Sequence, residues 1–78
     1  MALKLGNLPL ATIRKLLIFQ GCKSIGTKGG HEKWSRSDLL RPIILQTHID
    51  PVPEFIVHQI LRTLQINRSQ LQSILSKL

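Results

Sequence analysis

Residues Lys28–Arg36 read KGGHEKWSR, and the glycine pair in this stretch decides the fold. Both central residues of a type I′ turn need positive φ angles, which glycine adopts without a steric penalty. Gly29 and Gly30 therefore predict a two-residue turn that joins two antiparallel strands, residues 22–28 and 31–36. These segments contain few strong strand formers, so the turn is the main signal for the pairing.

The chain on either side of this hairpin follows helix and strand patterns. Apolar residues at helical spacing predict an amphipathic helix over residues 9–20, and a β-branched, apolar run predicts a third strand over residues 43–47. Two further helical stripes follow, one after Pro53 and a short one after an Asn67–Gln70 capping box. The resulting order, helix, three-stranded antiparallel sheet, helix and short C-terminal helix, predicts one α+β domain over residues 1–78.

The charge of the chain is concentrated in its first half. The formal net charge is +7, from 11 cations and 4 anions. Seven of the cations lie in one stretch: Arg14, Lys15, Lys23, Lys28, Lys33, Arg36 and Arg41. Only Glu32 and Asp38 oppose them there. This distribution favours a surface that binds a polyanion such as RNA, with an acidic protein partner or a solubilising surface as the alternatives.

Composition excludes several functional classes. The chain is 42% hydrophobic over 78 residues, which suits a small core but not a large cofactor pocket. It has no apolar run of about 18 residues, so no membrane span is expected. The single cysteine, Cys22, excludes an internal disulfide framework and favours a reduced, cytoplasmic protein. Cys, His and carboxylate residues show no metal-ligand spacing, so neither a metal nor another cofactor is expected.

The residues around the predicted turn fit the cleavage of RNA without a metal. In that reaction the 2′-hydroxyl loses a proton as it attacks the phosphate, and the 5′-oxygen gains one as it leaves. A histidine such as His31 can move protons near neutral pH. Lys28 and Lys33 can stabilise the phosphate charge, and the backbone of Gly29 and Gly30 can approach a phosphate closely. The same histidine can also be an ordinary surface residue.

Other residues near the turn leave two interpretations open. Trp34 either stacks on a nucleobase or anchors a small core. His48, just before Asp50-Pro51, is either an auxiliary proton-transfer group or a residue that hydrogen-bonds its loop. Arg36 adds a further cation for phosphate binding.

The order of these motifs resembles the HicA family of bacterial toxins, the mRNA interferases of HicA–HicB toxin–antitoxin pairs. The resemblance rests on four motifs in order: Phe19-Gln20-Gly21-Cys22, Lys28-Gly29-Gly30-His31, His48-Ile49-Asp50-Pro51-Val52-Pro53 and Ile60-Leu61-Arg62-Thr63-Leu64-Gln65-Ile66. The resemblance as a whole covers nearly the entire chain, from about residue 8 to 76.

The resemblance implies a fold like the double-stranded-RNA-binding domain and a cytoplasmic type II toxin that cleaves mRNA without a cofactor. It implies that His31 is catalytic and that a HicB-like antitoxin protein covers the site. Two positions depart from the family pattern. Gly30 stands where many family members have Ser or Thr, and Gly26 stands where an arginine is common. Both departures put the cleavage rate in question more than the fold. A non-catalytic RNA-binding module of the same fold and a subunit that docks an acidic protein remain the alternatives.

Overall fold

A computed structural model describes residues 6–78 of the chain. Its six elements follow one another as α1 (Leu10–Phe19), β1 (Lys23–Lys28), β2 (His31–Ser35), β3 (Ile43–Gln46), α2 (Glu54–Leu64) and α3 (Arg68–Leu75). The predicted order of helices and strands is confirmed.

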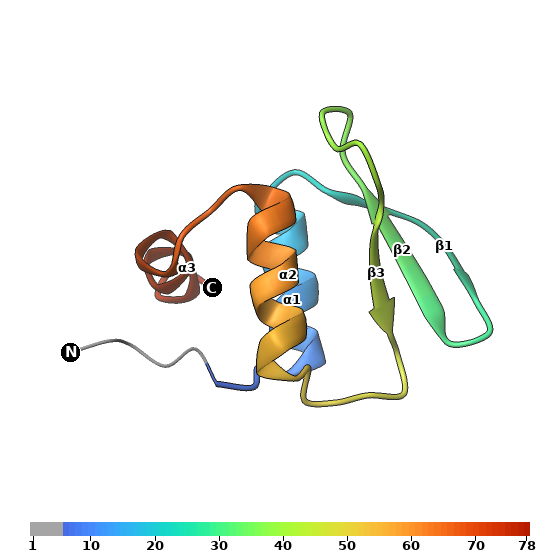
Figure 1. Ribbon diagram of the computed structural model, residues 1–78, viewed down its shortest axis with the longest axis horizontal. Helices are drawn as coiled ribbons and strands as arrows, with labels where there is room; N and C mark the ends of the chain where they lie inside the picture. The colour runs from blue at the N-terminus through green and yellow to red at the C-terminus, as the bar shows by residue number, and fades with distance from the viewer. Residues whose placement is uncertain (1–5) are drawn as a thin grey trace.

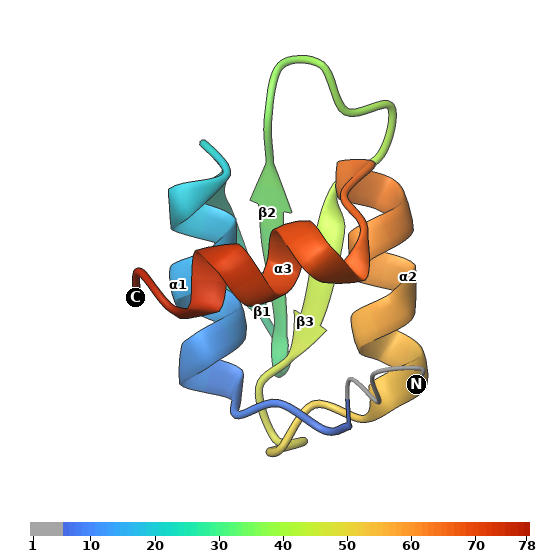
Figure 2. The same cartoon turned by 90° about the vertical axis from the view of Figure 1, so that its left-hand side faces the viewer.

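The elements stack in three layers (Figures 1 and 2). The antiparallel sheet has the order β1-β2-β3, so each strand pairs with its neighbour in the chain. Helices α1 and α2 lie side by side on one face of the sheet, and α3 crosses them on the side away from it (Figure 2). The face of the sheet that points away from the helices is called the outer face below. It is not covered by any described element (Figure 1).

The apolar core lies between the inner face of the sheet and the helices. Trp34 and Leu45 contribute from the sheet, with 6% and 1% of their surface exposed. The Trp34 indole N–H donates to Glu32 Oε1 at 2.6 Å, which satisfies its polar atom within the core. Of the two interpretations of Trp34, the core anchor is therefore the one that the structure supports.

Local signals in the sequence explain where the helices begin and end. The left-handed Gly21, with φ 82°, follows α1 directly after its C-cap residue Gln20. The predicted capping box of α3 is present, with reciprocal hydrogen bonds of 2.8 Å between Asn67 and Gln70. Asp50 Oδ1 accepts from the backbone N–H of Leu10 at 2.9 Å and so stabilises the start of α1 from a distant loop.

No helix within residues 6–78 combines the length and the apolar character that a membrane span needs.

Candidate functional site

The strand register determines which side chains share the outer face. Residues directly opposite one another in an antiparallel sheet point to the same side. His31 lies opposite Lys28 on β1 and Gln46 on β3, and Lys33 lies opposite Ile44. The outer face therefore carries Lys23, Lys28, His31, Lys33, Ser35, Ile44 and Gln46.

A β-bulge places Lys23 and Lys28 on this same face. Positions five apart in a regular strand point to opposite faces, because side chains alternate with a period of two. The register shifts by one residue between Ser24 and Gly26, so Ile25 is the extra residue and the alternation is reset. Gly26 has a φ of 146°, a conformation that side chains disfavour.

The hairpin turn has the predicted geometry, with φ angles of 57° at Gly29 and 83° at Gly30. The Gly30 carbonyl accepts two hydrogen bonds from Thr47, one from its backbone N–H at 2.8 Å and one from its hydroxyl at 3.2 Å. This contact brings the end of β3 to the turn. A Cβ atom on Gly30 would lie 3.4 Å from Nδ1 of His48, so the two predicted histidines belong to one region of the surface.

A shallow hollow on the outer face adjoins His31, the candidate catalytic residue. It is lined by Ile25, Gly26, Thr27, Lys28, Gly29, His31 and Lys33. Of the residues predicted to hold phosphate, Lys28, Gly29 and Lys33 border it, and Gly30 completes the turn beside them, so the structure brings all but one of these residues together near His31. The exception is Arg36.

Arg36 lies beyond the far end of β2 from His31 and is already engaged. Its guanidinium forms an ion pair with Asp38 at 2.6 Å and donates to the Gln20 carbonyl at 2.6 Å. The hydrogen bond between the two side chains raises the pKa of Arg36 and lowers the pKa of Asp38. Nearby, burial raises the pKa of the Cys22 thiol. These contacts indicate that Arg36 fixes the connection between α1 and the loop after β2.

Arg14 is also paired, so it does not belong to the outer face. Its guanidinium contacts Glu32 at 3.1 Å on the helix side of the sheet. The two acidic side chains of the basic stretch therefore neutralise Arg14 and Arg36. Within residues 6–78, the outer-face cations Lys23, Lys28 and Lys33 have no acidic partner. Two of these lysines, Lys28 and Lys33, border the same hollow as His31.

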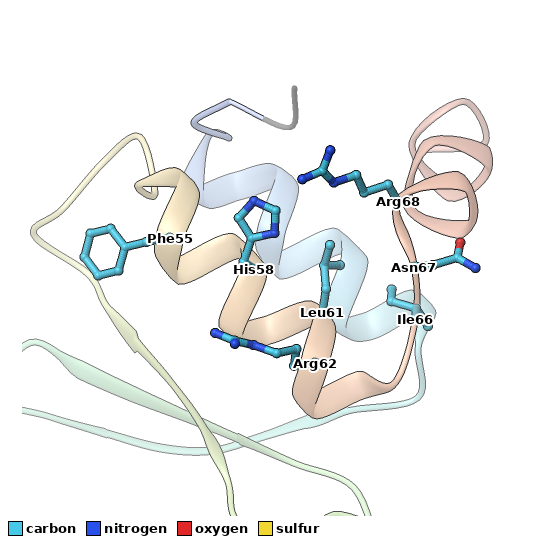
Figure 3. A pocket seen from close by; sticks show the side chains of 7 residues that line it. All are labelled: Phe55, His58, Leu61, Arg62, Ile66, Asn67 and Arg68. Carbon is cyan, nitrogen blue, oxygen red and sulfur yellow. The ribbon is translucent and has the colours of Figure 1, made fainter. Parts of the chain in front are cut away.

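A second hollow lies between α2 and α3 (Figure 3). Two arginines and a histidine are among its lining residues, which are Phe55, His58, Leu61, Arg62, Ile66, Asn67 and Arg68. This cluster was not predicted from the sequence. The spacing of Phe55, His58 and Arg62 on one helix face is the signal that was available.

Among residues 6–78, no group of three or more His, Cys, Asp or Glu side chains is arranged to hold a metal ion. Comparison of the chain with protein families, curated proteins and solved structures finds no match.

Proposed function

We propose that this protein is a HicA-type toxin, an endoribonuclease that cleaves mRNA without a metal or other cofactor and uses His31 as its catalytic residue. The observation that carries the proposal is the outer face of the sheet. There, a histidine lies opposite one lysine and beside another, and among the described residues the charged side chains that share this face with it are lysines. Such a surface attracts an RNA backbone and offers a proton-transfer group to it.

In the proposed mechanism, phosphate binds over the Gly29-Gly30 turn between Lys28 and Lys33. His31 accepts the proton of the 2′-hydroxyl as that oxygen attacks the phosphorus, or donates the proton that the 5′-oxygen takes up on leaving. His48 carries out the other transfer, an assignment supported by its position beside Gly30. The lysines stabilise the extra negative charge of the pentavalent intermediate. The products are a 2′,3′-cyclic phosphate and a 5′-hydroxyl.

The proposal includes a fold of the double-stranded-RNA-binding type and a cytoplasmic location. It also includes a HicB-like antitoxin as protein partner. An acidic antitoxin would cover His31, Lys28 and Lys33, because the outer face is open and its charge favours a partner of opposite sign. Arg36 would contribute less to such a contact, since Asp38 already neutralises it.

One observation favours the alternative of an RNA-binding module that does not cleave. Gly30 supplies no hydroxyl at the turn, where the HicA pattern often has Ser or Thr. The backbone N–H groups and lysines would still bind phosphate, but one group that orients it would be missing.

The test is an RNA cleavage assay on the purified chain, with and without a chelator. Cleavage that persists in the chelator and leaves 2′,3′-cyclic phosphate ends supports the nuclease. RNA binding without cleavage favours the binding module, and the absence of both contradicts any RNA function.

A further inference from the structure

The hollow between α2 and α3 has the composition of a binding site and plays no part in the proposed cleavage. Phe55, His58 and Arg62 occupy positions i, i+3 and i+7 of α2, so they form one row along the helix. Side chains on a helix lean toward its N-terminus, which brings the Arg62 guanidinium back toward His58. Figure 3 shows the His58 ring between the guanidinium groups of Arg62 and Arg68.

No acidic residue lines this hollow. The chain has four acidic side chains, and each accepts a hydrogen bond from a group outside it. Glu32 and Asp38 pair with arginines near the sheet. Asp50 and Glu54 accept from the backbone N–H groups of Leu10 and Gly6. Within residues 6–78, Arg62 therefore has no carboxylate partner, and the hollow is positively charged.

The remaining walls of the hollow are apolar. Leu61 is buried, with 4% of its surface exposed, and forms the floor together with the half-buried Ile66. The Phe55 ring, at the end of the α2 row, is 64% exposed and offers a free aromatic surface. A flat aromatic group can stack on such a ring, whereas the planar guanidinium fork matches the oxygen atoms of a phosphate.

We propose that this hollow binds a nucleoside phosphate. Arg62 and His58 bind the phosphate group, and Phe55 contacts the base. The same chemistry is present in a free nucleotide and in the 5′-terminal nucleotide of an RNA strand. The site is separate from the cleavage site, because none of its lining residues lies on the outer face of the sheet.

The test is a titration of the full chain with adenosine 5′-monophosphate, adenosine and inorganic phosphate. Binding is monitored by the NMR chemical shifts of the backbone amides and by calorimetry. We expect the nucleotide to shift the amide signals of Phe55, Arg62 and Arg68 and to bind more tightly than adenosine or phosphate. Arg62→Gln should weaken nucleotide binding about tenfold, the effect of one lost charged hydrogen bond. Phe55→Ala should weaken the binding of the nucleotide and of adenosine but not that of phosphate.

Matched controls separate this site from general charge and from the cleavage site. Lys15→Gln removes the same charge from an exposed position on α1 and should leave nucleotide affinity unchanged. His31→Ala should also bind the nucleotide as the wild type does, whether or not the protein cleaves RNA. Nucleotide shifts confined to residues 28–33, or an unchanged affinity in Arg62→Gln, would overturn the inference.

Two RNAs then identify the source of the ligand, with His31→Ala used to prevent cleavage. The site is assigned to RNA ends if a short RNA with a 5′-phosphate binds more tightly than the same RNA with a 5′-hydroxyl. This difference in affinity should then be lost when Arg62→Gln is added. Equal binding of the two RNAs, together with specific binding of the mononucleotide, assigns it to a free nucleotide.

Discussion

The salt dependence of RNA binding follows from the number of unpaired lysines on the outer face. Lys23, Lys28 and Lys33 have no acidic partner among the described residues. Each phosphate contact with single-stranded RNA contributes about −0.7 to the slope of log affinity against log salt concentration. Three such contacts predict a slope of about −2 from the outer face.

Single substitutions should make this slope less steep by predictable steps. Lys28→Gln or Lys33→Gln should make it less steep by about 0.7 each, because one counterion-releasing contact is lost. Lys15→Gln, on the helix side of the sheet, should weaken binding slightly and leave the slope unchanged. Arg36→Gln should also leave it unchanged, because the Arg36 guanidinium is held by Asp38 and the Gln20 carbonyl.

Fluorescence anisotropy with a 2′-O-methyl RNA measures the slope without cleavage, because the attacking hydroxyl is blocked. Equal slopes for the wild type, Lys28→Gln and Lys33→Gln would refute the assignment of phosphate contacts to the outer face. If Lys15→Gln makes the slope less steep by as much as Lys28→Gln does, net charge rather than the outer face governs RNA binding.

Three further predictions concern the framework of the site. Glu32→Gln should lower the free energy of unfolding by about 1–3 kcal/mol in urea denaturation, because the half-buried Arg14 loses its charged partner; an unchanged unfolding midpoint would contradict this. Gly30→Ala should lower it by about 1–2 kcal/mol, since φ is 83° there and a side chain strains the backbone in that conformation; equal stability would show that the turn relaxes freely. The hydrogen bond from Arg36 lowers the pKa of Asp38 below its ordinary value, so the ion pair stabilises the fold at neutral pH and this contribution is lost as the pH falls through the folded pKa; the melting temperatures of wild type and Asp38→Asn should therefore differ at neutral pH and converge in acid.

Much of the fold was predictable because its signals are local. The glycine pair at 29–30 specifies its turn by φ alone, and the Asn67–Gln70 capping box specifies the start of α3 by side-chain hydrogen bonds. The apolar stripes then predict which helix faces are buried. These signals need no knowledge of distant contacts.

The features that the sequence did not reveal depend on pairing between distant segments. The bulge at Ile25 exists only relative to β2, so the face of Lys23 could not be assigned from β1 alone. The engagement of Arg36 depends on the Gln20 carbonyl, 16 positions earlier in the chain. Arg62 and Arg68 line one hollow because α3 turns back across α2. The histidine and lysines of the outer face were predicted together because the hairpin turn places them close in sequence as well as in space.

The central claim is that His31 on the outer face performs proton transfer in RNA cleavage. The most direct measurement compares RNA cleavage in chelator by the wild type, His31→Ala and His58→Ala, each checked for folding by its melting temperature. His58 is a matched control, because it is a histidine of α2 in the second hollow. The account predicts cleavage by the wild type and by His58→Ala, and none by a folded His31→Ala protein. Full cleavage by His31→Ala would contradict it.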